Sequence, residues 1–244
     1  MPERHRGPHP QDAKCFGKEQ LERLKTAADE LAWLLSRGYS MGASNELVGD
    51  HHQLTSRQRL AIARVVCAKE EVEERQAKQV PLSLLKEKTV IIDGFNLLIT
   101  IETALGGGAI FNCMDGCCRD LSAVYGSYKI MAETRQALTL IGRTLERSSP
   151  QKVVWLFDRP VSNSGRIAEM VREVGKEHNW PFEAETSDST DALLSRSSAI
   201  VISCDSAILE RAKSWCNLAC ETITQQIPGV WTIDLTDRLQ RDRD

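Results

Sequence analysis

The stretch Thr89-Val90-Ile91-Ile92-Asp93-Gly94-Phe95-Asn96 decides the fold that we expect for this chain of 244 residues. Its first four residues favour a β-strand, and an unbroken run of this kind is typical of a parallel strand buried on both faces. Asp93 stands where the strand ends, and Gly94 allows a sharp turn. Because ligands bind outside the carboxyl ends of parallel strands, this carboxylate is placed for a metal ion or a polar substrate. The alternative interpretation of Asp93-Gly94 is a plain turn.

Two further apolar runs also end on an aspartate. Residues 153–157 lead into Asp158, and residues 199–204 lead into Asp205. Right-handed crossovers between parallel strands bring such ends to one edge of the sheet. Three carboxylates at one edge repel each other unless a cation lies among them. We therefore expect Mg²⁺ or Mn²⁺ as the cofactor, since both prefer oxygen ligands.

The segment Ile92-Asp93-Gly94-Phe95-Asn96 resembles the opening motif of PIN-like and NYN nuclease domains. Asp158 and Asp205 fall where that superfamily keeps further metal-binding acids, and the resemblance covers about residues 88–236. It implies a PIN-like three-layer α/β/α domain with a mainly parallel central sheet. It also implies that Asn96 binds the substrate or orients Asp93.

More acids are candidates for the metal site. Asp191 directly precedes Ala-Leu-Leu and fits the aspartate that opens a helix in PIN-like domains, while Asp188 is the second choice and an alternative N-cap. The same resemblance suggests an acid near a helix after the first strand, for which Asp115 and Asp120 are candidates. Asp120 alternatively caps a helix that we expect over about residues 121–147.

Substrate contacts are predicted beside these acids. Arg119 is a candidate phosphate contact. Ser162, Asn163 and Ser164 precede a helical pattern, and the free N–H groups of a helix start suit a phosphate. A plain capped turn is the alternative for these three residues.

Residues 18–80 have the pattern of a small all-α domain, between a disordered tail at 1–17 and the α/β domain at 81–244. Helical spacing covers residues 21–35 and about 43–48. Thr55 and Gln58 form a capping-box pattern at the start of a third helix, which we expect to continue through residue 78. Residues 19–78 resemble a small prokaryotic domain family of unknown function, which suggests a bacterial or archaeal source. Basic residues near its turns are either phosphate contacts or ordinary surface arginines; they are Arg37, Arg57, Arg59 and Arg64.

Composition indicates an ordinary globular protein. Hydrophobic residues make up 41% and charged residues 27%, and the net charge is −3. An apolar run of about 18 residues is absent, so we expect no membrane association. The eight cysteines match neither a disulfide framework nor, at Cys113, Cys117 and Cys118, a common zinc pattern. Buried thiols, including Cys216 and Cys220, and a reducing cytoplasm are the expectation.

The sequence therefore predicts metal-dependent hydrolysis of a phosphodiester bond in structured or single-stranded RNA. Asp93, Asp158, Asp191 and Asp205 are the predicted catalytic and metal-binding residues. RNA is the expected partner, and a homodimer is compatible with the sequence. One alternative is a catalytically inactive PIN-like RNA-binding or assembly module. An aspartyl phosphatase is disfavoured, because Phe95 stands where such enzymes usually need a second aspartate.

Overall fold

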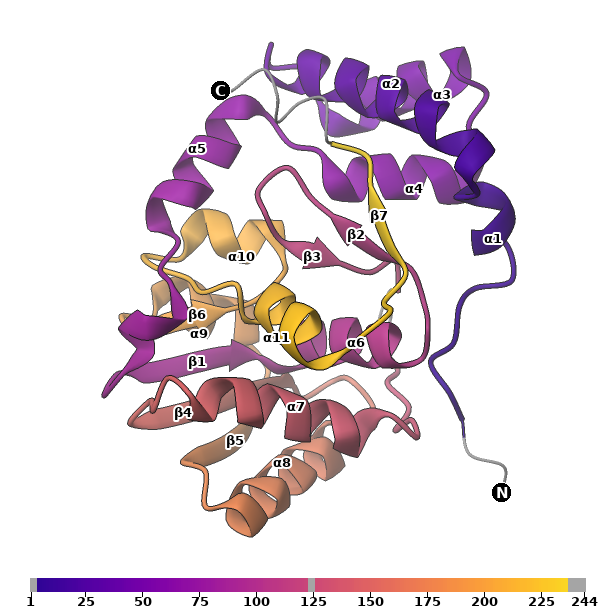
Figure 1. Cartoon of the computed structure of the whole chain (residues 1–244). Coiled ribbons are helices and arrows are strands. Elements are labelled where there is room, and N and C mark those ends of the chain that lie inside the picture. Colours follow the sequence, from indigo (N-terminus) through magenta and orange to yellow (C-terminus); the bar gives the residue numbers. More distant parts are fainter. Residues whose placement is uncertain (1–3, 123–125, 237–244) are drawn as a thin grey trace.

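The computed structural model describes residues 4–122 and 126–236 (Figure 1). Helices make up the N-terminal part: α1 (Asp12–Cys15), α2 (Lys18–Leu35), α3 (Met41–His51), α4 (Ser56–Val65) and α5 (Lys69–Lys78), followed by the short 3-10 helix η1 (Leu82–Leu85). The strands are β1 (Thr89–Asp93), β2 (Ile110–Asn112), β3 (Cys118–Arg119), β4 (Lys152–Asp158), β5 (Phe182–Ser187), β6 (Ile200–Ile202) and β7 (Thr232–Asp234). The later helices are α6 (Gly94–Leu105), α7 (Thr134–Glu146), α8 (Ser164–His178), α9 (Thr190–Arg196), α10 (Ser206–Arg211) and α11 (Leu218–Gln226).

The central sheet has the strand order β5-β4-β1-β6, and each neighbouring pair is parallel. Val90 of β1 lies opposite Val153 of β4 and opposite Ile200 of β6. The prediction of a mixed α/β fold with a mainly parallel central sheet is confirmed. So is the expectation that a helical region precedes it.

Each face of the central sheet carries its own core. Val90 and Ile92 pack with Trp155 and with helices α6, α7, α8 and α11. Ile91 and Leu156 point to the other face and pack with α9 and α10. Helix α6 after β1 and helix α10 after β6 therefore lie on opposite faces. Such a reversal between adjacent strands opens a crevice at their carboxyl ends.

A second, smaller sheet joins the helical region to the rest of the chain. It has the order β3-β2-β7, with β2 antiparallel to β3 and parallel to β7. Phe111 of β2 and Ile233 of β7 are buried in one core with residues of α2, α3 and α4. Figure 1 shows this sheet between the helical region and the central sheet.

The expected helix over residues 121–147 is wrong in its first half. Helix α7 begins at Thr134, and residues 123–125 lie outside the described residues. Asp120 does not cap a helix; its carboxylate accepts hydrogen bonds from the Thr100 hydroxyl at 2.7 Å and the Ser122 N–H at 2.6 Å. Tyr128 then enters the core and hydrogen-bonds with buried Glu102. These anchors keep residues 126–133 non-helical.

The N-terminal region also differs from its prediction in two places. The third helix is interrupted, because Val66 takes an extended conformation and is buried together with Cys67. The capping box at Thr55 and Gln58 is confirmed. Residues 4–17 are not a disordered tail: Asp12 pairs with Arg57, and Phe16 is buried in the helical core.

A disulfide joins Cys118 of β3 to Cys220 of α11, across 102 residues of sequence. The expectation of buried thiols throughout is therefore wrong for this pair. The six other cysteines are free and buried, at positions 15, 67, 113, 117, 204 and 216.

Within the described residues, no helix combines the length and the apolar character that crossing a membrane requires.

Candidate functional site

A pocket of about 410 Å³ opens at the carboxyl ends of β1, β4 and β6. Five of its lining residues are aspartates: Asp93, Asp120, Asp158, Asp191 and Asp205. The remaining lining residues are Leu60, Arg64, Phe95, Asn96, Ile99, Leu121 and Ser122. The structure thus brings side chains of the helical region and of the α/β region together around one acidic cavity.

Local structure explains why the aspartates meet there. Asp93 is the last residue of β1, and Asp158 is the last residue of β4. Asp205 follows β6 as the N-cap of α10, where its carboxylate accepts the Ala207 N–H at 2.8 Å. Asp191 stands in the first turn of α9. The crevice outside the strand ends therefore receives an acid from each of three strand–helix junctions.

Gly94 is required by close packing. A Cβ atom at this position would lie 2.3 Å from the Phe157 ring and 2.7 Å from the Leu156 carbonyl oxygen. Because residue 94 has no side chain, the start of helix α6 packs directly against β4. This packing holds Asp93 at the carboxyl end of β1, where the pocket opens.

Hydrogen bonds fix the loop after β6 to the end of β1. The Ser203 hydroxyl donates to Asp93 Oδ2 at 2.8 Å and accepts the Asp205 N–H at 3.0 Å. Asn96 Oδ1 accepts the Cys204 N–H at 3.2 Å. Asn96 therefore holds the loop that carries Asp205, in addition to lining the pocket.

The acids raise one another's proton affinity. Burial raises the pKa of Asp93 to about 7, and Asp205 and Asp158 add to this, although the Ser203 hydrogen bond opposes it. Burial, Asp158 and Asp205 also raise the pKa of Asp191. The side-chain carboxylates of Asp158 and Asp191 accept no hydrogen bond and form no ion pair within the described part of the chain. The pocket therefore concentrates negative charge that the described protein groups leave largely unbalanced.

The carboxylate oxygens of the pocket suit a hard divalent cation, because such ions prefer oxygen ligands. The carboxylates are not drawn together, however. Among the described residues, the one group of three donor side chains with ligand atoms all within 4.8 Å of one another is Glu30, His51 and His52, on α2 and at the end of α3. An ion in the aspartate pocket would have to draw the oxygens closer than they lie here, against their mutual repulsion.

Asp115 and Arg119 lie away from the pocket lining. Asp115 is fully buried and accepts from Arg119 at 2.6 and 2.9 Å and from Arg75 at 2.9 Å. Burial would raise the pKa of Asp115, but the two arginines outweigh it and the pKa is lowered. Neither residue is available to a metal ion or substrate, so we remove both from the site. Asp120, in contrast, lines the pocket.

The predicted phosphate loop is also occupied by contacts within the protein. Ser162 exchanges hydrogen bonds of 3.1 Å with the backbone of Tyr128, and the Asn163 side chain donates to the Tyr128 carbonyl at 2.7 Å. Ser164 donates to the Arg159 carbonyl at 3.3 Å. Asp188 pairs with Arg159. These four predicted residues do not line the pocket.

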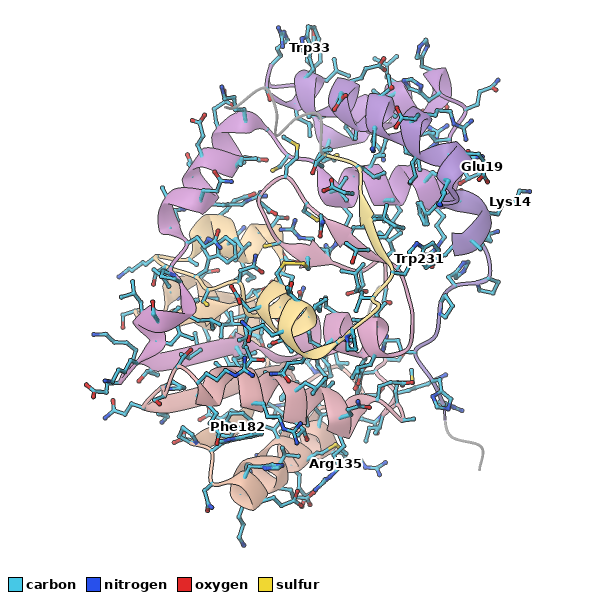
Figure 2. All side chains as sticks on the ribbon, viewed as in Figure 1. Lys14, Glu19, Trp33, Arg135, Phe182 and Trp231 are labelled. Carbon is cyan, nitrogen blue, oxygen red and sulfur yellow. A yellow bond between two sulfur atoms is a disulfide. The ribbon has the colours of Figure 1, made fainter. Side chains whose placement is uncertain are left out.

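Of the four arginines singled out in the helical region, Arg64 alone lines the pocket. Arg57 pairs with Asp12, and Arg59 pairs with Asp50. Arg37 lies over the ring of Trp33, 3.5 Å from its centroid. Figure 2 shows Trp33 on the outer surface of the helical region, far from the central sheet. Apolar spacing placed residues 60–66 on a helix, but it carries no signal that this helix would meet the sheet edge.

Two family models match the chain. One is described as "Domain of unknown function (DUF5616)" and matches residues 82–221. The other is described as "Protein of unknown function (DUF434)" and matches residues 23–78. The chain is also similar to "Uncharacterized protein MJ0935" of Methanocaldococcus jannaschii, with 32% identity over 202 residues that span 82% of this chain and 96% of the relative. No solved structure matches the chain.

These matches correct the family assignment. The resemblance of residues 88–236 to PIN-like and NYN nucleases is wrong as an assignment, because the family model that covers this region is a different one. The physical reason is that an aspartate at the end of a buried strand is a general device of parallel α/β sheets and does not specify one family. The chain belongs to the family described as "Domain of unknown function (DUF5616)".

Proposed function

We propose that the aspartate pocket binds Mg²⁺ or Mn²⁺ and hydrolyses a phosphodiester bond, with RNA as the substrate. Asp93, Asp158 and Asp205 are the proposed metal ligands, and exposed Asp191 and buried Asp120 complete the acidic lining. The observation that carries the proposal is the convergence of aspartates from separate strand–helix junctions on one cavity. An ion bound there would lower the pKa of a bound water and stabilise negative charge on the reacting phosphate.

The state of Asp93 supports this proposal. Burial and the neighbouring carboxylates raise the pKa of Asp93 to about 7, so the metal-free pocket resists ionisation of this group. Unbalanced carboxylates in a partly buried pocket are costly, and a divalent cation removes that cost. Perturbed acids in a cleft are characteristic of functional sites, although ion-pair networks also produce them.

The chain's own residues would orient the acids. Ser203 and Asn96 tie the loop after β6 to the end of β1, so that Asp93 and Asp205 keep a fixed relation. Arg119 donates to the Cys204 carbonyl at 2.6 Å and so holds the same loop through its backbone. Asp158 lacks such a restraint within the described residues and is free to move toward an ion.

Cleavage of an end-labelled single-stranded RNA in Mg²⁺ or Mn²⁺, with and without chelator, tests the proposal. Asp158→Asn removes a charge without removing a hydrogen bond among the described residues, so it should fold normally and lose about 100-fold or more in rate. Asp50→Asn, an exposed change on α3, is the matched control and should cleave normally. RNA that is bound but never cut would favour a binding module. Equal cleavage by wild type and Asp158→Asn would contradict the proposed site.

A further inference from the structure

We propose that helix α4 forms the substrate-recognition wall of the pocket. Arg64 binds a phosphate of an unpaired RNA strand, and Leu60 packs against the adjacent base. This inference rests on the proposed function for the identity of the pocket, and it adds the substrate class and the residues that select it.

Arg64 is the one Lys or Arg among the described residues that line the pocket. Its guanidinium makes no hydrogen bond or ion pair with any described residue, whereas Arg57 and Arg59 on the same helix are paired. A half-buried cation beside several aspartates would be expected to pair with one of them if its purpose were to neutralise them. It stays unpaired instead, with its donors free for an anion. A guanidinium suits phosphate oxygens because two of its N–H groups can bind in parallel.

Leu60 lies four residues before Arg64, so the two side chains share one face of α4. The opposite face carries Ala61, Ile62 and Val65, which are buried in the helical core. Leu60 remains 47% exposed although it lines the pocket. An exposed large apolar side chain at the mouth of a polar cavity marks a surface that a flat apolar group of the ligand can cover.

The lining of the pocket as a whole selects the ligand. The lining combines Leu60 and two buried apolar side chains, Ile99 and Leu121, with five aspartates and Arg64. A ligand must therefore combine an apolar face with a phosphate, and its phosphate must find a cation in an otherwise anionic cavity. A nucleotide unit of a nucleic-acid strand has this combination. Its base can reach Leu60 only after leaving the helical stack, which favours an unpaired strand.

Fluorescence anisotropy with a short labelled RNA, in Ca²⁺ and with strand integrity checked on a gel, measures recognition separately from cleavage. Wild type should bind the unpaired RNA at least about tenfold more tightly than the corresponding duplex. Arg64→Gln should weaken binding about tenfold and flatten the slope of log K against log salt by about 0.7. Arg64→Lys should restore the salt slope. Leu60→Ser should weaken binding about fivefold at an unchanged slope.

Arg143→Gln is the charge-matched control, because Arg143 is exposed near the end of α7. The chain after α7 leads to the amino end of β4, whereas the pocket lies at the carboxyl ends of the strands. Arg143→Gln should bind as wild type does. Equal affinity and slope for Arg64→Gln and wild type, preference for the duplex, or no binding of any strand by wild type would each overturn the inference. An unpaired DNA of the same sequence shows whether the sugar matters.

Cleavage in Mn²⁺, measured on the same proteins, distinguishes the two proposals. If Arg64→Gln both binds RNA with wild-type affinity and cleaves it at saturating RNA, the proposed role of α4 in recognition is wrong and the proposed function stands. If wild type binds through Arg64 but never cleaves, the recognition wall stands and the proposed function is wrong.

Discussion

Asp93 is the residue on which the chemistry of the pocket depends. Burial and two neighbouring carboxylates raise its pKa from 3.8 to about 7. The folded state therefore holds this proton more tightly than the unfolded state does. Between about pH 4 and pH 7 the unfolded chain loses the proton first, so this group makes stability fall as pH rises. Above pH 7 the full cost of the buried charge is present.

Asp93→Asn should therefore stabilise the metal-free protein at about pH 8. The amide keeps an oxygen for the Ser203 hydroxyl and removes the charge. Thermal unfolding in chelator should show a melting temperature that is a few degrees higher, since about 1 kcal/mol corresponds to about 2–4 °C for a chain of this size. The gain should vanish at about pH 4, where wild-type Asp93 is protonated. A lower melting temperature at pH 8 would contradict this interpretation of the pocket.

The place of some pocket residues could be predicted from the sequence, and the place of others could not. Asp93, Asp158 and Asp205 follow apolar strands directly, so their place at one edge follows from local pattern and from the handedness of crossovers. Arg64 and Leu60 could not be assigned in this way, because their position depends on how α4 packs against the second sheet. Asp115 was misplaced for a related reason: its partner Arg75 lies 40 residues earlier in the sequence.

At the scale of elements, strand β3 and helix α5 are joined by a buried ion-pair network. Asp115 lies between Arg75 of α5 and Arg119 of β3. Arg75 also binds Glu210 of α10 at 2.5 Å. Arg119 continues the network to the Cys204 carbonyl, one residue before Asp205. The helical region is thus connected to the loop that carries a pocket aspartate.

Asp115→Asn should be strongly destabilising, because it leaves two buried arginines without their shared carboxylate. Breaking a buried pair in this way typically costs about 3–5 kcal/mol. Urea unfolding measures the loss. Asp188→Asn breaks the exposed pair with Arg159 and serves as the control, with an expected change of about 0–1 kcal/mol. A loss below about 1 kcal/mol for Asp115→Asn would show that the network does not support the fold.

Errors in predicting elements also have a physical cause. Helix α7 does not extend before Thr134 within the described residues, because the Tyr128 hydroxyl is held by Glu102 and Thr134 in the core. The break after α4 comes from burial of Val66 and Cys67 in the helical core. The disulfide joins cysteines separated by 102 residues, so local sequence gave no sign of it. Tertiary contacts decided each of these cases.

At the scale of the whole molecule, the helical region and the α/β region share a core. Phe111, Ile233 and Leu235 belong to the α/β region but are buried with residues of α2 and α4. The N-terminal segment adds further ties, including the Arg6–Glu102 ion pair at 2.8 Å. The two regions are therefore expected to unfold together.

Removal of residues 1–81 should abolish cooperative folding, because it exposes the buried face of the second sheet. Differential scanning calorimetry should show one transition for the full chain. The shortened chain should give a broad transition or none, and it should bind an apolar dye. A sharp transition for residues 82–244 at the temperature of the full chain would show that the shared core contributes little.

The most direct test of the central claim is a crystal of the full chain soaked in Mn²⁺ and measured for anomalous scattering. The claim predicts a peak in the pocket, with oxygens of Asp93, Asp158 and Asp205 drawn to within about 2.0–2.3 Å of it. The same soak of Asp93→Asn should lose the peak or weaken it severely. No peak in the wild-type pocket, or a peak confined to Glu30, His51 and His52, would contradict the claim that the aspartates form a metal site.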